Sequence, residues 1–98
     1  MTENKYIVQL KEMVLDFLRD KPIRVILYGS RARGDHRPGS DVDLALSTEG
    51  EIDRLLLANL RELLEESTIP YKVDIIDLKH TSEVFQAEIM KEAIVWKN

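Results

Sequence analysis

The chain has 98 residues, of which 44% are hydrophobic and 33% are charged, and its formal net charge is −4. This length and composition indicate one globular domain over residues 1–98, and the negative charge argues against a protein that coats nucleic acid. No apolar stretch is long enough for a membrane span, no signal-peptide pattern is present, and cysteine is absent. We therefore expect a cytoplasmic protein without disulfides or thiolate zinc sites.

A helix and a strand are predicted at the start of the chain. From about Glu3 to Arg19, apolar residues recur every three or four positions, as they do along one face of a helix. Proline at position 22 should end this helix. The β-branched and aromatic run Ile23–Tyr28 is then predicted to be a buried strand.

The polar residues that could carry chemistry begin directly after this strand. Glycine in the Gly29–Ser30 bend would let backbone N–H groups approach a bulky anion, and a helical turn at Arg31–Gly34 would add further N–H groups. Arginine occurs three times shortly after the bend, as Arg31, Arg33 and Arg37, and once before it, as Arg24. These positive charges fit a small anion such as a triphosphate better than a nucleic-acid duplex.

Two aspartates stand at the head of the second predicted strand, Asp41–Ser47. Residues two apart in a strand point to the same face, so Asp41 and Asp43 can reach one metal ion, or two ions about 3.5–4 Å apart. A calcium-binding loop is excluded because Ala45 and Leu46 stand where a ligand and a glycine would be required. A P-loop is excluded because no Gly-Lys-Ser/Thr motif follows the bend.

A helix is predicted next, because Thr48 and Glu51 have the spacing of a capping box and leucines continue to about Glu66. Leu57 falls to one side of the predicted apolar face and could touch a partner. That face comprises Ile52, Leu55, Leu56, Asn59, Leu60, Leu63 and Leu64.

A third strand and a last helix complete the predicted elements. The strand is expected over Tyr71–Leu78, and the helix over about Ser82–Trp96, with Phe85, Ile89, Ala93 and Trp96 on one face. The predicted order is therefore α, β, β, α, β, α, which indicates an α/β (α+β) fold with a small mixed sheet flanked by helices. His36 and His80 are interpreted as loop and turn residues.

Asp74 interrupts the apolar third strand. Burying an unpaired carboxylate there would cost several kcal/mol unless a cation meets it. If this strand lies beside Asp41–Ser47, Asp74 joins Asp41 and Asp43 in the oxygen-rich environment that Mg²⁺ prefers. Asp77 points to the opposite face and is expected to face solvent or to cap a helix.

The spaced motif formed by residues 29–34 (GSRARG) and 40–44 (SDVDL), with Val73-Asp74-Ile75 further on, resembles the minimal nucleotidyltransferase family. This family, also called MntA-like antitoxins, belongs to the DNA polymerase beta superfamily. The resemblance covers nearly the whole chain. It implies the polymerase beta-like fold, a short mixed sheet flanked by helices.

The resemblance also implies an adenylyltransferase that uses ATP and two Mg²⁺ ions. Asp41 and Asp43 would bridge the ions, and Asp74 would help to hold and deprotonate the attacking hydroxyl. Gly29 and Ser30 would bind the β and γ phosphates, and Arg31 or Arg33 would neutralise the departing pyrophosphate. The expected site is thus Asp41, Asp43 and Asp74 for metal and catalysis, with Gly29, Ser30, Arg31, Arg33 and Ser40 for the nucleotide.

In such a family the partner is often a HEPN-domain ribonuclease toxin, whose tyrosine is adenylylated. An alternative is a non-catalytic antitoxin subunit that neutralises its toxin by binding alone. A polynucleotide substrate is a weaker option, because this chain has no room for domains that hold a template. Homo- or hetero-oligomers are open, since a partner could cover Leu57 or Trp96.

Overall fold

Four strands form one mixed sheet in the order β3–β2–β1–β4. The structure is a computed structural model that describes residues 4–98, so the predicted helix start at Glu3 lies outside the described residues. The elements are α1 (Lys5–Phe17), β1 (Arg24–Tyr28), α2 (Ser30–Arg33), β2 (Val42–Ser47), α3 (Arg54–Glu65), β3 (Val73–Asp77), the 3₁₀ turn η1 (Leu78–His80), α4 (Glu83–Glu92) and β4 (Ile94–Lys97). None of the helices over residues 4–98 is long and apolar enough to cross a membrane.

The pairing of the strands confirms the predicted mixed sheet. β2 and β3 are parallel neighbours, whereas β1 pairs antiparallel with β2 on one side and with β4 on the other. The third predicted strand therefore does lie beside the second, as the metal-site prediction required.

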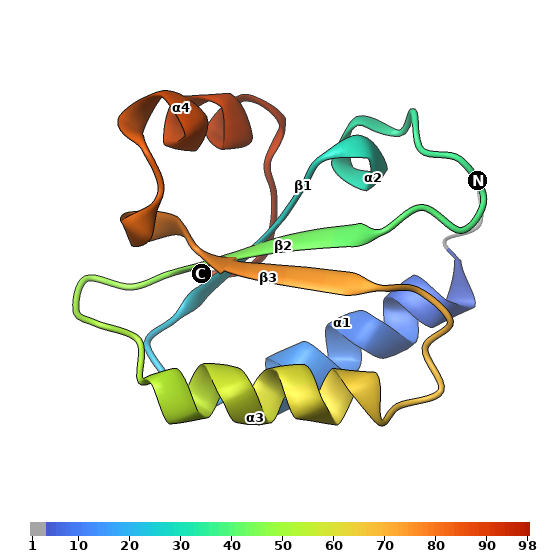
Figure 1. The fold of residues 1–98 in the computed structure, drawn as a ribbon, viewed down its shortest axis with the longest axis horizontal. Coiled ribbons are helices and arrows are strands. Elements are labelled where there is room, and N and C mark those ends of the chain that lie inside the picture. Colours follow the sequence, from blue (N-terminus) through green and yellow to red (C-terminus); the bar gives the residue numbers. More distant parts are fainter. Residues whose placement is uncertain (1–3) are drawn as a thin grey trace.

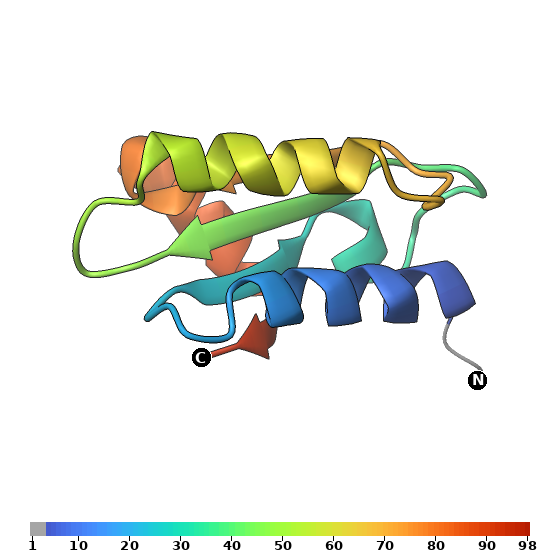
Figure 2. The same cartoon turned by 90° about the horizontal axis from the view of Figure 1, so that it is seen from below.

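Helices α1 and α3 cover one face of the sheet and enclose the main core. They run in opposite directions across this face (Figures 1 and 2). The alternate residues of β2 that point toward them, Val42, Leu44 and Leu46, are fully buried, and so are Leu10 of α1 and Leu60 of α3. This alternation follows from the two-residue period of a strand, and it sends the residues between them to the other face.

The other face is covered only in part. Ile89 of α4 packs there with Ile26, Ala45 and Leu78 in a second, smaller cluster. The short helix α2 lies over the other end of this face (Figure 1). The sheet therefore has a closed apolar face and a second face whose α2 end carries polar side chains.

The start of α3 differs from the prediction. Asp53, not Thr48, caps the helix, since its carboxylate accepts the Leu55 N–H at 2.8 Å. The Thr48 hydroxyl instead donates to the Pro22 carbonyl at 3.0 Å, and Glu51 contacts the 3₁₀ turn. The capping-box spacing is present, but contacts with distant segments of the chain engage both of its side chains.

The buried face of α3 was predicted only in part, since Leu60 and Leu64 are buried as expected but Leu55 and Leu63 are exposed. Leu57 is only 9% exposed and lies in the core, whereas Leu55 is 66% exposed. Three consecutive leucines let more than one face fit the helical period, and packing against α1 and the sheet selects the face with Leu57, Leu60 and Leu64. Leu57 is thus a core residue rather than a partner contact.

The last predicted helix is too long. α4 ends at Glu92, and residues 94–97 form β4 beside β1. Ile94, Val95 and Trp96 are β-branched or aromatic, and pairing with the otherwise open edge of β1 satisfies backbone groups that a longer helix would leave unpaired there. Trp96 is buried in the main core, so it needs no partner to cover it.

Candidate active site

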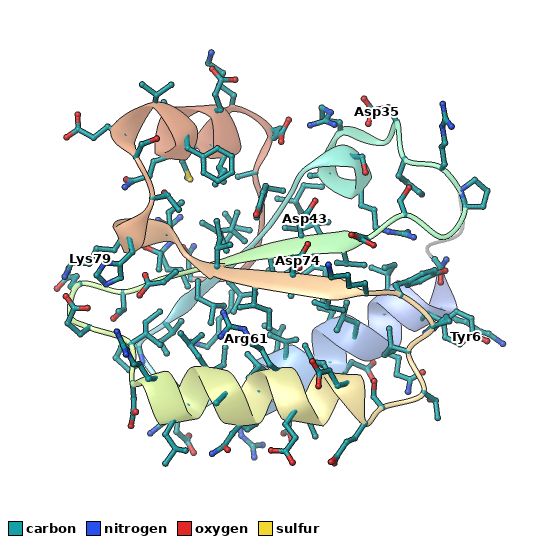
Figure 3. The ribbon with its side chains drawn as sticks, in the orientation of Figure 1. Tyr6, Asp35, Asp43, Arg61, Asp74 and Lys79 are labelled. Carbon is teal, nitrogen blue, oxygen red and sulfur yellow. The ribbon has the colours of Figure 1, made fainter. Side chains whose placement is uncertain are left out.

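Three polar side chains form one row across the sheet. Tyr28 of β1 is the register partner of Asp43 in β2, which is the register partner of Asp74 in β3. Side chains directly opposite each other point to the same face, here the face away from α1 and α3 (Figure 3). The predicted juxtaposition of Asp43 and Asp74 is therefore present, and both residues are half-buried.

The row is a concentration of negative charge. The pKa of Asp43 is raised mainly by burial and next by the nearby Asp74 and Asp41 carboxylates. The positive charge of Arg33 lowers it in part. Burial together with Asp43 and Asp74 raises the pKa of Tyr28 to about 12. The carboxylates repel one another, and the protein neutralises this repulsion only in part. A hard divalent cation such as Mg²⁺, which prefers oxygen ligands, would neutralise the rest.

Asp41 lies apart from this pair. It precedes β2, and its side chain is exposed. A metal ion can be held where side-chain oxygen or nitrogen atoms of three residues lie close together. Within residues 4–98, three such atoms lie within 4.8 Å of one another only in the group Glu51, Asp77 and His80. The three aspartates are therefore more widely spaced than that cluster, although Asp41 is close enough to raise the pKa of Asp43.

The Gly29 bend packs directly against Asp43. Gly29 has φ +77° and ψ −159°, a conformation almost restricted to glycine. A Cβ atom added to Gly29 would collide with the Asp43 carboxylate oxygen Oδ2. Glycine is thus required here both by the backbone conformation and by the approach of the aspartate.

The bend leaves two backbone donors open. The N–H groups of Ala32 and Arg33 both bond the Gly29 carbonyl at 3.1 Å, whereas those of Ser30 and Arg31 meet no acceptor within the described part of the chain. Orphan N–H groups at a glycine bend favour an anion. Two open N–H groups therefore lie beside the aspartate row, and the role expected for Ser30 stays a prediction. The Gly29 N–H is not free for an anion, because it donates to Glu92 Oε1 at 3.0 Å.

The two candidate arginines differ in their surroundings. Arg31 donates to the Ser40 carbonyl at 2.9 and 3.1 Å, and its guanidinium lies 4.2 Å from the centre of the Tyr71 ring. Arg31 therefore anchors the loop that precedes β2. Ser40 also orders this loop, since its hydroxyl accepts the Arg37 N–H at 2.9 Å.

Arg33 is the arginine whose charge acts on Asp43. Its Nη1 atom donates to both carboxylate oxygens of Glu92, at 2.9 and 3.1 Å, and its Nε atom donates to Asp35 at 3.1 Å. The side chain is 47% exposed, and its charge counteracts the rise in the pKa of Asp43.

Sequence reasoning missed Glu92 and Tyr71. Glu92 ends α4, and the register of β4 with β1 brings it opposite Gly29. Recognising residues 94–97 as a strand would have placed Glu92 just before it, and the fold then supplies the register, in which Leu27 pairs with Ile94. Tyr71 gives no signal in the sequence, since its stacking with Arg31 joins segments that only the fold brings together.

A second polar cluster occupies the opposite end of β2 and β3. His80 Nε2 lies 3.0 Å from a Glu51 carboxylate oxygen and 3.7 Å from one of Asp77, and Lys79 Nζ lies 3.3 Å from Glu51. Asp77 also accepts the Lys79 N–H at 3.2 Å, which confirms its predicted capping role. This network links the β2–α3 loop to η1, away from the aspartate row.

Comparison with known proteins identifies the family of this chain. The family model described as "Polymerase beta, Nucleotidyltransferase" matches residues 10–98. A relative from Haemophilus influenzae, named probable protein adenylyltransferase MntA, is 36% identical over 86 residues, which are 88% of this chain and 70% of the relative.

Solved structures share the fold. A protein designated a minimal nucleotidyltransferase has a TM-score of 0.74 and 28% identity, covering 92% of each chain. A toxin–antitoxin complex with AMP-PNP has a TM-score of 0.70 and 24% identity, covering 88% of this chain and 71% of the other. A complex of the tri-AMPylated Shewanella oneidensis HEPN toxin with MNT antitoxin has a TM-score of 0.65 and 21% identity, covering 91% and 70%. The chain belongs to the polymerase beta nucleotidyltransferase family, is a homologue of MntA and is a nucleotidyltransferase.

Proposed function

We propose that this protein transfers AMP from ATP to a hydroxyl group of a partner protein, in a reaction that depends on Mg²⁺. The observation that carries the proposal is the pairing of Asp43 with Asp74 on adjacent strands, directly against the Gly29 bend. Carboxylates that can hold a cation and backbone N–H groups that can hold phosphate thus meet at one point of the surface.

Asp43 and Asp74 would hold the metal, and Asp41 would add a ligand from the end of the loop. When bound there, Mg²⁺ ions would neutralise charge on the entering and leaving oxygens of the α-phosphate. We propose two ions, because transfer at the α-phosphate needs charge neutralised at both the entering and the leaving oxygen.

The nucleotide phosphates would lie against the bend. Among residues 4–98, the N–H groups of Ser30 and Arg31 have no acceptor and could donate to phosphate, and Arg33 supplies the guanidinium whose charge acts on Asp43. The acceptor hydroxyl would attack the α-phosphorus, pyrophosphate would leave, and the hydroxyl proton would pass to Asp74 or to water. Arg31 and Ser40 would act by holding the loop that carries Asp41.

We propose a HEPN-domain toxin as the acceptor and the cytoplasm as the site of action, where ATP is available. The support is the named adenylyltransferase activity of the Haemophilus influenzae relative and the AMPylated HEPN toxin in the Shewanella oneidensis complex. Transfer of AMP to the toxin would make this protein an antitoxin.

Label transfer tests the proposal. The chain is incubated with Mg²⁺, a HEPN toxin purified from the same source, and ATP labelled at either the α or the γ phosphate. We expect label on the toxin from α-labelled ATP only, and its loss with EDTA, Asp43→Asn or Asp74→Asn. Asp16→Asn is the matched control, because that carboxylate is exposed on α1 and, among residues 4–98, forms an ion pair with Arg19 alone.

Two results would contradict the proposal. Label from γ-labelled ATP would indicate a kinase, and full transfer by Asp43→Asn and Asp74→Asn would remove these residues from the chemistry. If the toxin is silenced equally by wild type and Asp43→Asn without any label, the non-catalytic antitoxin is correct instead. The clustering of like charges favours the enzyme, since a protein that only binds gains nothing from the repulsion around Asp43.

A further inference from the structure

Glu92 holds the glycine bend and the arginine at the same time. Its Oε1 atom accepts the Gly29 N–H at 3.0 Å, and its two carboxylate oxygens accept from Arg33 Nη1 at 3.1 and 2.9 Å. The bonds to Arg33, and then the one from Gly29, lower the pKa of Glu92, so the carboxylate is charged at neutral pH. Its side chain is 23% exposed, less than the 47% of Arg33.

The fold fixes the position of this carboxylate. Glu92 is the last residue of α4, and α4 is packed on the sheet through Ile89, which is only 1% exposed. On its other side Glu92 leads into β4, whose Ile94 pairs with Leu27 of β1. Elements on both sides therefore hold the Glu92 backbone next to the bend.

These contacts leave other donors free. Glu92 and Asp35 occupy Nη1 and Nε of Arg33, so Nη2 has no acceptor among residues 4–98. The bond to the Gly29 N–H fixes the peptide that precedes the open N–H groups of Ser30 and Arg31. The occupied donors thus face the protein, and the open ones remain for a ligand.

We propose that Glu92 is a positioning residue for the nucleotide: it clamps Arg33 and the Gly29 peptide, and so presents Arg33 Nη2 and the N–H groups of the bend to the phosphates of ATP. This inference rests on the proposed function. Glu92 itself contacts no substrate and acts through the groups it holds.

Binding of AMP-PNP with Mg²⁺, measured by calorimetry, tests the proposal. Glu92→Gln keeps an oxygen for the Gly29 N–H but loses the charge that pairs with Arg33, and we expect it to weaken binding several-fold. Arg33→Gln should weaken it about tenfold. The double variant should bind no more weakly than Arg33→Gln alone, because Glu92 acts through that arginine. In label transfer, Glu92→Gln should raise KM for ATP more than it lowers kcat.

Glu88→Gln is the matched control. Glu88 lies one turn earlier on α4, is 61% exposed and, within the described part of the chain, pairs with Lys91 alone, so its loss should leave AMP-PNP binding unchanged. Equal or tighter binding by Glu92→Gln would overturn the proposal, because the carboxylate would then merely compete with phosphate. Additive losses in the double variant would also overturn it.

NMR separates this inference from the proposed function. The Gly29 amide and Arg33 Nη1 signals should shift in Glu92→Gln but not in Glu88→Gln, whether or not nucleotide is present. If these shifts occur but the wild type binds no AMP-PNP, Glu92 holds Arg33 and Gly29 without positioning a nucleotide. Both the inference and the proposed function are then wrong. If the wild type binds AMP-PNP and the shifts are absent, the inference alone is wrong.

Discussion

Replacing Gly29 with alanine tests the close packing between the bend and the aspartate row. Gly29 has φ +77° and ψ −159°, and a Cβ atom there would collide with Asp43 Oδ2. The substitution therefore does two things: it forces alanine into a conformation that nearly excludes it, and it pushes the Asp43 carboxylate away from its place beside Asp74.

The two effects have different magnitudes and different readouts. The backbone strain should cost about 1–3 kcal/mol, which for a chain of this size lowers the unfolding temperature by roughly 4–20 °C. The displaced carboxylate should lower the rate of label transfer on the order of 10²-fold, since a shift of about 1 Å in a reacting group has that effect. Thermal denaturation and label transfer measure the two losses separately.

Gly34→Ala supplies the matched control. Gly34 also has a positive φ, +84°, but a Cβ atom there would meet nothing within 4 Å. It should lose about 1–2 kcal/mol of stability through strain alone and keep nearly all of its activity. If Gly29→Ala and Gly34→Ala transfer AMP equally well at a temperature where both are folded, the contact between Gly29 and Asp43 is not needed for catalysis.

Three further predictions concern charge and packing. Because burial and nearby carboxylates raise the pKa of Asp43 above its usual 3.8, its contribution to folding stability is lost as the pH rises from 3.8 through the raised value. At pH 7 in EDTA, Asp43→Asn should therefore unfold at a higher temperature than wild type. The difference between the two unfolding temperatures should shrink toward pH 3. An unfolding temperature below that of wild type at pH 7 would contradict this. The same substitution should lower the pKa of Tyr28 from about 12, as followed by NMR of labelled tyrosine, because it removes one nearby negative charge; an unchanged pKa would show that burial alone sets it. Trp96→Ala should cost about 3–5 kcal/mol in chemical denaturation, since Trp96 fills the main core from β4, whereas an exposed partner contact would cost almost nothing.

The sequence predicts the central strands and the aspartate pair because both depend on local pattern. Apolar runs bounded by proline and glycine locate β1 and β2, and the alternation within each strand sends Asp43 and Asp74 to the face opposite the main core. The neighbouring position of β2 and β3 was an assumption, and the parallel pairing confirms it. The strand was also expected to include Asp41, but β2 begins at Val42 and leaves Asp41 in the loop before it.

What the sequence did not predict depends on contacts between distant segments. Residues 94–97 fit a helical period as well as a strand, and pairing with the open edge of β1 decides between them. Glu92 contacts the Gly29 N–H because that pairing places it beside the bend. Arg31 stacks on Tyr71, which is far from it in the sequence. Thr48 and Glu51 failed as a cap for the same reason, because Pro22 and η1 engage their side chains.

The metal site is tested most directly by a crystal structure with Mn²⁺ in place of Mg²⁺ and with AMP-PNP, in which anomalous scattering locates the manganese. We expect a manganese peak bound by both Asp43 and Asp74, with the phosphates on the N–H groups of Ser30 and Arg31. A peak at Glu51, Asp77 and His80 alone, with none at Asp43 and Asp74, would contradict the assignment of the aspartate pair as the metal site.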